Sequence, residues 1–535
     1  VPTNGSQSDS GSGGEVSGNY AVLNPLHNYN SPTYANGNLE LSNTSTGHWK
    51  SAQATIGVTS GKWYWESTMS GASQYYTLGV AIASEVTNNY TGSGDAFVYD
   101  GRGFKNGPGA SSVSYGATYT SGDTIGVALD LDAGTLVFYK NGVSQGTAFS
   151  SGLTGKTLFP QFSVYYTSAV TQLVNFGQRA FAYSAPSGFK ALCTTNLPTP
   201  TIADGSDYFE AKTYTGNGSS QSITTSFSPD LVWVKTRSVV RNHGLFDTIR
   251  GADKVLASNL TDGESGFSGT GYVTAFNSDG FSVGAQNSVN QSSATLVAWC
   301  WDAGSSTASN TDGSITSSVR ANQTAGFSIV TYTGSGSATS VGHGLGAAPD
   351  AIIVKNRSTS GYKWPVYHSG LPANESVALN LAWGYTDIAD YFDAPSSTVF
   401  NISSDADINK SGDNFVAYCF SSVEGFSKFG THTGTGVSGS PFVYLGFKPA
   451  LLIIKKQGSG NWFIHDYKRP GYNQNTGPLR IAAEVELTVT TYDLDLLSNG
   501  FVMRTTGGDA NGSGLDFIYF AWAQNPFQAN GGLAR

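Results

Sequence analysis

The sequence predicts an all-β protein in which one larger β-sandwich is followed by three related small β-sandwich repeats in tandem. Three observations indicate this fold class. Apolar residues alternate with small or polar ones over short stretches, which is the period of a strand with one buried face. Gly is abundant, at 67 of 535 residues, as expected for many tight turns between short strands. A set of three motifs recurs three times in the same order.

The clearest strand signal lies between Gly122 and Gly142. Residues 125–131 alternate, and Asp-Ala-Gly at 132–134 then supplies a turn, because Gly adopts positive φ without steric cost. The alternation resumes through Phe138. Asn-Gly at 141–142 is the dipeptide that two-residue hairpin turns prefer, so this stretch predicts a β-meander.

Four segments in this part of the chain together resemble a known family. They are the meander, Gly-Lys-Trp-Tyr-Trp-Glu at 61–66, Leu-Phe-Pro at 158–160, and Asn-Phe-Gly-Gln at 175–178 followed by Phe181. Their order, over residues 45–195, resembles the SPRY (B30.2-like) domain, although the helical segment that some members carry at the N-terminal side is not recognisable. The resemblance implies a bent antiparallel two-sheet sandwich and a binding role, with no enzymatic activity.

The second part of the chain repeats. Each copy has a Thr-Gly-x-Gly turn, a Pro-x-hydrophobic run that ends in Lys, and a closing aromatic strand. The turns lie at 214–218, 332–336 and 432–436, the runs at 229–235, 349–355 and 449–455, and the aromatic strands at 296–301, 415–420 and 517–522. Because the runs are apolar on both faces, we expect each to be a strand buried between two layers, which predicts a small β-sandwich for each copy.

These patterns divide the chain into six segments. They are a Gly/Ser-rich arm (1–18), the SPRY-like sandwich (19–195), a Pro-rich linker (196–207), repeat 1 (208–304), repeat 2 with a leading linker (305–424), and repeat 3 with a C-terminal tail (425–535). The chain begins at Val1 and not at Met, which indicates a processed or truncated start.

Composition excludes several classes of protein. The net charge of −9 argues against nucleic-acid binding, which needs clustered Lys and Arg. No stretch of eighteen apolar residues exists, so we expect no membrane insertion. The three cysteines are far apart and predict neither a disulfide framework nor a metal site. Charged residues make up only 12% of the chain while aromatics reach 13%, which argues against disorder.

We predict no catalytic, cofactor-binding or metal-binding residues. Asp405-Ala-Asp407 imitates the start of a calcium loop, but Lys410 stands where that loop needs Gly, so a solvated loop is favoured, with calcium in another loop geometry left open. The acidic pairs at 130/132 and 493/495 lie beside turns, where turn chemistry explains them better than glycosidase chemistry. The seven histidines lack ligand spacing. His243, His368 and His465 follow the buried runs of the successive copies, which favours a repeated packing role over catalysis.

Aromatic clusters between the predicted strands are the best candidates for ligand contact, since Tyr and Trp dominate binding hot spots and stack on sugar rings. In the SPRY family, the loops between strands carry ligand recognition, which favours those in the first module. The alternative is that these side chains form the sandwich core or contacts between chains. The candidates are Tyr75, Tyr76, Tyr90, Tyr99, Tyr115, Tyr119, Tyr165, Tyr166, Tyr362 and Trp364.

The order of a SPRY-like module, a Pro-rich linker and β repeats resembles bacteriophage tail-fibre and other appendage proteins. This resemblance implies a non-enzymatic virion appendage, located on the virion surface, that assembles as a homo-oligomer, a trimer by analogy. Its expected partners are other copies of itself, other virion proteins, and a host surface glycan or protein. The alternatives are a secreted or cell-surface carbohydrate-binding or matrix fibre protein, which would be extracellular, and a capsid decoration protein. A depolymerase is disfavoured, and so is a peptide-binding adaptor of the kind found among eukaryotic SPRY proteins, because of the attached repeats.

Overall fold

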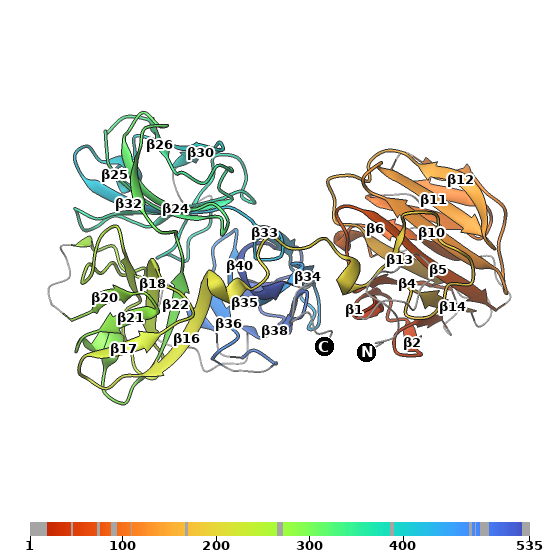
Figure 1. The fold of residues 1–535 in the computed structure, drawn as a ribbon, viewed down its shortest axis with the longest axis horizontal. Coiled ribbons are helices and arrows are strands. Elements are labelled where there is room, and N and C mark those ends of the chain that lie inside the picture. Colours follow the sequence, from red (N-terminus) through yellow and green to blue (C-terminus); the bar gives the residue numbers. More distant parts are fainter. Residues whose placement is uncertain are drawn as a thin grey trace. The chain divides into compact units, whose positions relative to one another are not determined.

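The computed structural model describes residues 19–43, 47–71, 75–86, 94–108, 110–165, 170–264, 271–385, 390–469, 473–476, 478–481 and 492–526. The chain separates into two compact units, unit 1 with residues 1–199 and 527–535 and unit 2 with residues 200–526. Both units are built almost entirely of β-strands, which confirms the predicted fold class (Figure 1). Within the described residues, no helix is long and apolar enough to cross a membrane.

Unit 1 contains two antiparallel sheets. The first sheet consists, in spatial order, of β1 (Leu23–Tyr29), β4 (Trp49–Ala54), β13 (Phe159–Tyr165), β6 (Tyr76–Ala81), β7 (Ala96–Asp100), β8 (Phe104–Gly107) and β9 (Ala110–Ser114). The second consists of β12 (Val143–Phe149), β11 (Thr135–Lys140), β10 (Thr124–Asp130), β5 (Lys62–Ser70), β14 (Val170–Asn175), β3 (Glu40–Asn43) and β2 (Thr33–Ala35), with β15 (Lys190–Ala191) parallel to β5. The short 3-10 helices are η1 (Ala83–Glu85) and η2 (Thr194–Asn196).

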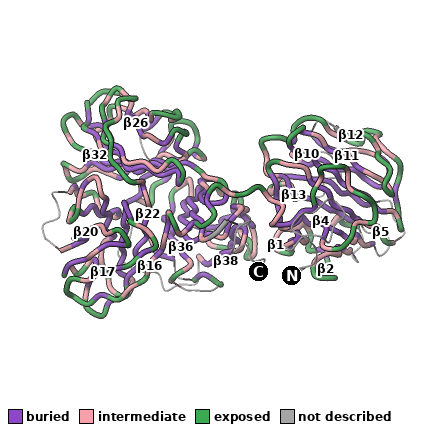
Figure 2. Tube along the Cα trace, in the orientation of Figure 1, coloured by how far each residue is buried: buried purple, intermediate pink, exposed green. Residues whose placement is uncertain are grey.

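The predicted meander forms as expected in the second sheet. Strands β10 and β11 pair antiparallel from Ile125 opposite Lys140 to Asp130 opposite Thr135. The turn at Asn141 and Gly142 has positive φ at both residues, 48° and 79°, as a two-residue type I′ hairpin requires. Between the sheets lies one core that includes Trp63, Trp65, Leu78, Val127 and Phe162. Figure 2 shows these strands as buried segments.

Unit 2 contains three modules of the same design, which correspond to the three sequence repeats. Each module has a larger sheet, a three-stranded sheet and a four-residue helix. In module 1 (209–301) the larger sheet consists of β16 (Phe209–Thr215), β22 (Thr295–Trp301), β18 (Leu231–Thr236) and β19 (Gly244–Asp247). The three-stranded sheet consists of β17 (Gln221–Thr224), β21 (Gly280–Val283) and β20 (Val273–Asn277), and the helix is α1 (Asn287–Asn290). The 3-10 helix η3 (Gly205–Asp207) precedes it.

Modules 2 (307–420) and 3 (427–526) repeat this strand order. In module 2 the larger sheet consists of β23 (Thr307–Asn310), β24 (Ser317–Asn322), β25 (Phe327–Thr333), β32 (Asn414–Phe420), β27 (Ala351–Asn356), β28 (Pro365–His368) and β29 (Val377–Ala378). Its three-stranded sheet consists of β26 (Thr339–Gly342), β31 (Val399–Ile402) and β30 (Phe392–Asp393), and its helix is α2 (Ala406–Asn409). In module 3 the larger sheet consists of β33 (Ser427–Thr433), β40 (Asp516–Pro526), β35 (Phe447–Lys456), β36 (Trp462–Asp466) and β37 (Leu479–Arg480). Its three-stranded sheet consists of β34 (Phe442–Tyr444), β39 (Gly500–Met503) and β38 (Leu494–Leu497), and its helix is α3 (Gly508–Asn511).

The Pro-x-hydrophobic-Lys runs are the buried strands β18, β27 and β35, as predicted, and each has layers on both faces. The lysines that end the runs are buried as well. Lys355 donates hydrogen bonds to the carbonyl oxygens of Tyr362 (2.6 Å) and Thr261 (3.0 Å), so it caps loop carbonyls and links module 2 to module 1. Burial lowers the pKa of Lys355 to about 8.

The Thr-Gly-x-Gly motif is a structural turn. In each module, the first Gly of the motif lies so close to the backbone after the helix that an added Cβ would meet a carbonyl oxygen; for Gly334, Lys410 O would be 2.2 Å away. A buried Asn at the end of the helix then ties down the turn. Asn409 accepts from the Ser335 N–H (2.7 Å) and donates to the carbonyl of Ser337 (2.7 Å). Asn290 and Asn511 make the same contacts in modules 1 and 3.

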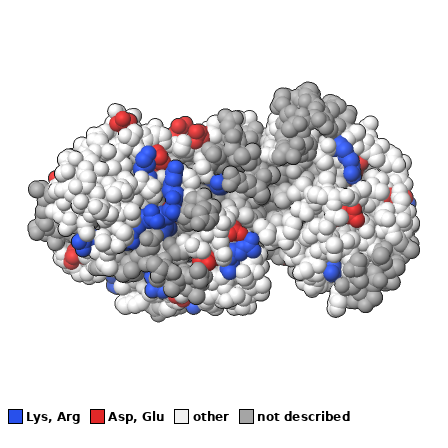
Figure 3. Space-filling view, turned by 90° about the horizontal axis from the view of Figure 1, so that it is seen from below, with Lys and Arg blue, Asp and Glu red and all other residues white. Residues whose placement is uncertain are grey.

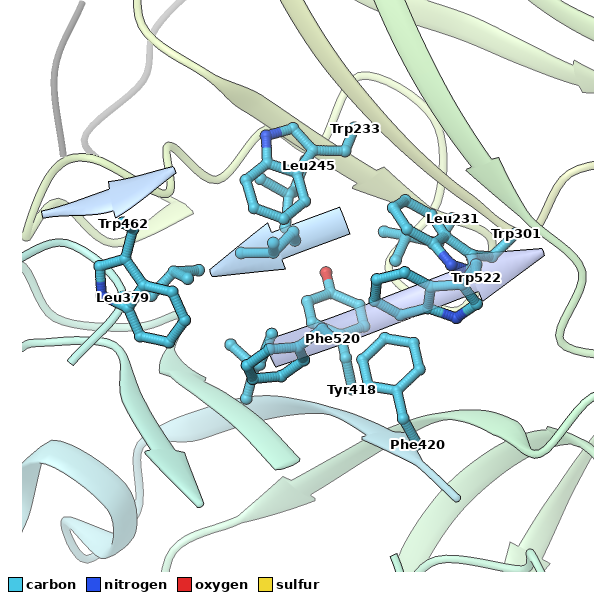
Figure 4. A pocket seen from close by; sticks show the side chains of 12 residues that line it. Leu231, Trp233, Leu245, Trp301, Leu379, Tyr418, Phe420, Trp462, Phe520 and Trp522 are labelled. Carbon is cyan, nitrogen blue, oxygen red and sulfur yellow. The ribbon is translucent and has the colours of Figure 1, made fainter. Parts of the chain in front are cut away.

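The three modules share one core, which the sequence did not predict. The largest hydrophobic cluster includes side chains from all three closing strands, among them Trp301, Phe420 and Trp522. Trp522 lies 5.4 Å from Trp301 and 5.3 Å from Phe420 between ring centroids. Figure 4 shows these rings around a cavity of about 20 Å³ that is lined by aliphatic and aromatic side chains. A cavity of that size and character has no polar partners for a water molecule.

Replacing Gly334 by Ala should destabilise the chain by more than about 2 kcal/mol, because the new Cβ overlaps a backbone carbonyl that cannot move without breaking the turn. Chemical denaturation followed by tryptophan fluorescence measures the change in the free energy of unfolding. The Gly508→Ala variant is the control, because an added Cβ at Gly508 meets nothing within 4 Å. Equal stability of the two variants would contradict the close approach.

Replacing Asn409 by Ala should cost about 2–4 kcal/mol of unfolding free energy, because it removes the three hydrogen bonds of a fully buried side chain, to the Ser335 N–H and to the carbonyls of Ser337 and Ser403. The exposed Asn287→Ala variant, at the first residue of α1, is the control, and thermal melting of both variants gives the comparison. A loss below 0.5 kcal/mol, within the range of ordinary surface substitutions, would show that water replaces the Asn409 side chain.

Candidate functional site

The first sheet of unit 1 presents a partly exposed row of aromatic side chains at one end of three neighbouring strands. Trp49 begins β4 and lies directly opposite Tyr165, which ends β13. The Tyr165 N–H donates to the carbonyl of Tyr75, the residue before β6 (3.0 Å). Residues directly opposite one another in a sheet share a face. The three rings, named here the aromatic row, therefore lie side by side.

The geometry within the aromatic row is that of favourable aromatic pairs. The ring centroids of Trp49 and Tyr165 are 5.3 Å apart, and those of Tyr75 and Tyr165 are 5.6 Å apart at an angle of 65°. Tyr75 is 39% exposed, and Trp49 and Tyr165 are half-buried. The row thus presents amphipathic rings whose positions are set by backbone pairing in the sheet.

A cation lies next to the aromatic row. Thr77 on β6 pairs with Asp100, the last residue of β7. Tyr75 comes just before β6 and Arg102 comes just after β7, so both lie at the same end of this strand pair. Arg102 donates from Nη2 to Asp100 Oδ2 at 2.7 Å, and its guanidinium lies 5.3 Å from the Phe104 ring. Partial burial lowers the pKa of Arg102, and the nearby Tyr75 opposes that shift.

Behind the aromatic row, the same face of the sheet is polar yet buried. Ser51 and Ser163 form one cross-strand pair, with 2.7 Å between their Oγ atoms. Gln53 and Gln161 form the next pair, and Gln53 donates from Nε2 to Gln161 Oε1 at 2.9 Å. The opposite face of these strands carries core residues such as Phe162. The polar pairs hold β4 and β13 in register and so fix the base of the aromatic row.

Asp100 ends this polar face and organises the turn that carries Arg102. Its carboxylate accepts hydrogen bonds from the backbone N–H groups of Arg102 (2.9 Å) and Phe104 (3.3 Å) and from Asn106 (3.3 Å). Burial raises the pKa of Asp100, and these hydrogen bonds oppose the rise. The carboxylate is therefore held by the turn and the adjacent cation.

Ten candidate residues came from the sequence, and the structure brings two of them, Tyr75 and Tyr165, together in the aromatic row. Tyr76, Tyr99 and Tyr119 lie in the core of unit 1, where the Tyr119 hydroxyl donates to the carbonyls of Tyr99 (2.8 Å) and Tyr76 (3.2 Å). These three side chains therefore belong to the sandwich core, which was the alternative to a role in ligand contact.

The other candidates lie elsewhere. Tyr115 is half-buried, and its hydroxyl donates to the Gly146 carbonyl at 2.5 Å. Trp364 is fully buried in unit 2 and donates from Nε1 to the carbonyls of Leu260 (3.0 Å) and Ala257 (3.1 Å). Tyr362 is half-buried, with Lys410 Nζ 5.3 Å from its ring. Tyr90 and Tyr166 lie outside the described residues.

Sequence reasoning missed Trp49 and Arg102. The signal for Trp49 was present, because Trp49, Ser51 and Gln53 alternate with Lys50, Ala52 and Ala54 along β4. Two alanines make this alternation weak, so the strand was not recognised. Arg102 carried no signal, because its place beside Tyr75 depends on the pairing of β6 with β7.

The acidic candidates have structural roles. Asp405 caps the helix α2 by accepting from the Asp407 N–H (2.7 Å), and Asp407 pairs with Lys363 (2.7 Å), so this segment is a capped turn and not an EF-hand loop. Asp130 pairs with Lys62 (2.9 Å), and Asp132 accepts from the Gly61 N–H (2.7 Å). Among the residues that the structure describes, no group of three His, Cys, Asp or Glu side chains could hold a metal ion.

Comparison with known families gives two matches. A model described as a domain of unknown function (DUF7483) matches residues 204–526, and the SPRY domain model matches residues 62–179. The SPRY resemblance seen in the sequence is therefore confirmed. The first match spans all three modules of unit 2 and more than half of the chain.

Relatives with curated names are plant and fungal proteins. The E3 ubiquitin-protein ligase RKP of Arabidopsis thaliana is 34% identical over 151 residues, which is 26% of this chain and 11% of that protein. Protein ssh4 of Sclerotinia sclerotiorum is 28% identical over 193 residues, which is 34% of this chain and 35% of that protein. The chain thus spans between about a tenth and a third of the length of these relatives.

Similar solved structures include SPRY domains. The SPRY domain of human HERC1 is 23% identical, with a TM-score of 0.26 over 28% of this chain and 96% of that chain. A human SPRY domain is 18% identical, with a TM-score of 0.23 over 27% of this chain and 93% of that chain.

The expected bacteriophage function is wrong. The plant and fungal relatives described above are eukaryotic proteins, and their names do not point to a tail fibre, a host-adhesion protein or a virion-surface location. The same finding removes the capsid-decoration and secreted-fibre alternatives. The error arose because the order of modules was read as that of a phage appendage, whereas the SPRY domain that carries the specific motifs also occurs in eukaryotic proteins.

Replacing Tyr165 by Ala should lower the free energy of unfolding by about 1–2 kcal/mol, because the half-buried ring loses its contacts with Trp49 and Tyr75. Replacing the fully buried Tyr76 by Ala should cost about 3–5 kcal/mol. Urea denaturation of both variants measures the difference. A large loss for the Tyr165 variant would show that the aromatic row is needed for folding.

Proposed function

We propose that this chain is a non-enzymatic protein that binds another protein through the aromatic row. The chain belongs to the family described as a domain of unknown function (DUF7483), and it carries a SPRY domain. The observation that carries this proposal is the set of three neighbouring rings, Trp49, Tyr165 and Tyr75, on the surface of the SPRY domain.

The chemistry of the aromatic row suits protein recognition. Trp, Tyr and Arg are the residue types most enriched in binding hot spots, and the row has all three once Arg102 is included. Backbone pairing in the sheet holds the rings in place, so little conformational entropy is lost when a partner binds. The row is therefore suited to an apolar or aromatic side chain flanked by peptide groups.

Charge has a small part in this proposal. On the face drawn in Figure 3, residues other than Lys, Arg, Asp and Glu make up most of the described surface. Only 12% of the residues in the chain are charged. We therefore expect the affinity for the partner to change little with ionic strength, in contrast to a partner captured by an extended charged patch.

The names of the relatives favour a protein partner. One relative is named as an E3 ubiquitin-protein ligase, a type of enzyme that acts on proteins. Because this chain spans only 11% of that relative, the proposal carries over a recognition role and no ligase activity. Self-association remains a prediction that native mass spectrometry of the purified chain would check.

Peptides selected from a random display library against the full chain should bind saturably, and the Trp49→Ala and Tyr165→Ala variants should each weaken that binding by about tenfold or more. Isothermal titration calorimetry at 50 and 300 mM salt measures the affinity. We expect less than a threefold difference between the two salt concentrations.

The control is Tyr183→Ala, which removes an exposed Tyr away from the aromatic row and should leave binding unchanged. Failure to select any saturable peptide, or equal binding by all three variants, would contradict the proposal. Glycan binding that depends on the same residues, measured on an array, would identify a different ligand class and would also contradict it.

A further inference from the structure

Each module of unit 2 presents the N–H of an aromatic ring to a backbone carbonyl of a neighbouring module. Trp364 of module 2 donates from Nε1 to the carbonyl of Ala257 in module 1 at 3.1 Å. Trp462 of module 3 donates in the same way to the carbonyl of Ala378 in module 2 at 2.9 Å. All four residues are buried, so these bonds lie inside the boundaries between modules, named here the seams.

The third seam carries the corresponding bond and joins module 1 to module 3. Trp233 donates from Nε1 to His243 Nδ1 at 3.0 Å, so the proton of the neutral ring is on Nε2. His243 Nε2 lies 3.2 Å from the carbonyl oxygen of Arg480 in module 3 and donates to it. Module 2 is thus bonded to module 1, module 3 to module 2, and module 1 to module 3, which makes a closed ring.

The three bonds occupy equivalent positions in the modules. Each donor lies at the start of the same strand, because His243 and Trp364 directly precede β19 and β28 and Trp462 begins β36. Each acceptor directly follows a residue that pairs with this strand in its own module. These pairs are Leu245–Leu256, Val366–Val377 and Ile464–Leu479. The seams therefore share one head-to-tail geometry.

A second set of contacts runs around the ring in the same direction. It starts from three residues at one position of the closing strands, which are Trp299, Tyr418 and Phe520. Trp299 of module 1 donates to Asp466 of module 3 at 3.2 Å. Tyr418 of module 2 donates to Asp247 of module 1 at 2.8 Å. Phe520 of module 3 packs against His368 of module 2, with 5.0 Å between ring centroids. Each seam thus has two contacts of equivalent origin.

We propose that these contacts form a head-to-tail docking surface whose partner is another module of the same kind, and that it accepts a module from a second copy of this chain once the peptide between modules 1 and 2 is cut. Surfaces of this type close into a ring when the rotation between neighbours allows it. Three modules complete the ring here, so unit 2 corresponds to a trimer encoded in one chain.

Docking of the modules does not depend on the peptides that connect them. Side chains of all three modules form one hydrophobic cluster, and burial of apolar surface stabilises an assembly whether or not its parts are covalently joined. The connection from module 1 to module 2 passes through Ser305 and Ser306, which are both exposed. A cut between them leaves the contacts of the seams in place.

The test uses the full chain with a protease recognition sequence inserted between Ser305 and Ser306. Cleavage gives an N-terminal piece with unit 1 and module 1 and a C-terminal piece with modules 2 and 3. We expect native mass spectrometry to find the two pieces still together. An affinity tag on the C-terminal piece, a dye on the N-terminal piece and an excess of unlabelled cleaved chain then measure how fast a second copy replaces the labelled piece. Urea is added only to a level that leaves tryptophan fluorescence unchanged.

Two variants report on the two seams that lie between the pieces. Trp364→Phe removes the donor to Ala257 between modules 2 and 1, and Trp299→Phe removes the donor to Asp466 between modules 1 and 3. Each should speed replacement by about tenfold or more, because a buried hydrogen bond is lost and interface changes act mainly on dissociation. Trp462→Phe is the matched control, because it removes the equivalent donor inside the C-terminal piece, and it should change the rate by less than about threefold.

Several results would overturn the proposal. One is separation of the pieces on cleavage, and another is failure of a second copy to replace the labelled piece. Replacement at the wild-type rate in the Trp299→Phe variant would show that the ring is open between modules 1 and 3. Equal acceleration by Trp462→Phe would show that the variants act through general stability and not through docking.

A milder pair of variants decides if Trp364→Phe does not fold. Tyr418→Phe removes only the hydroxyl that donates to Asp247 across the same seam, and it should also speed replacement. Its control is Tyr332→Phe, because the Tyr332 hydroxyl donates to the carbonyl of Ile408 within module 2 at 2.7 Å. Equal rates for these two variants would contradict docking through this seam.

Discussion

The arrangement of unit 2 depends on one buried junction, in which aromatic side chains of three modules meet and three polar contacts join the modules in pairs. The Tyr418 hydroxyl of module 2 donates to Asp247 of module 1 at 2.8 Å. Trp299 of module 1 donates to Asp466 of module 3 at 3.2 Å, and His368 of module 2 bonds to module 3. Each module therefore supplies a contact that another one needs.

Because these polar groups are buried, each of them destabilises the fold unless its hydrogen-bonding capacity and charge are satisfied. A carboxylate removed from water is strongly destabilising unless a cation and hydrogen bonds compensate it. Asp247 has Arg250 at 2.5 Å and Asp466 has Arg469 at 2.6 Å, each from the same Asp-x-x-Arg turn. In module 2 the equivalent position is His368, a neutral group that needs no cation.

Unit 1 also buries polar side chains, on one face of its first sheet. The face behind the aromatic row is buried but polar, and the Ser51–Ser163 and Gln53–Gln161 pairs satisfy each other across the strands. Such pairs hold the strand register, because a slip by one residue would place these groups against the apolar core. The rings at the end of the face are then presented at fixed positions, which is what a recognition surface requires.

Local sequence determined the elements of this protein. The alternation at 125–131 and Asn141-Gly142 define a hairpin because strand period and turn conformation are properties of neighbouring residues. The runs that end at Lys235, Lys355 and Lys455 define buried strands because both faces are apolar. The SPRY motifs identified the first domain. Only the tertiary structure decided that the three repeats share one core, that Trp49, Tyr165 and Tyr75 form one surface, and that His243 and His368 cross the seams, since each depends on pairing between residues more than 80 positions apart.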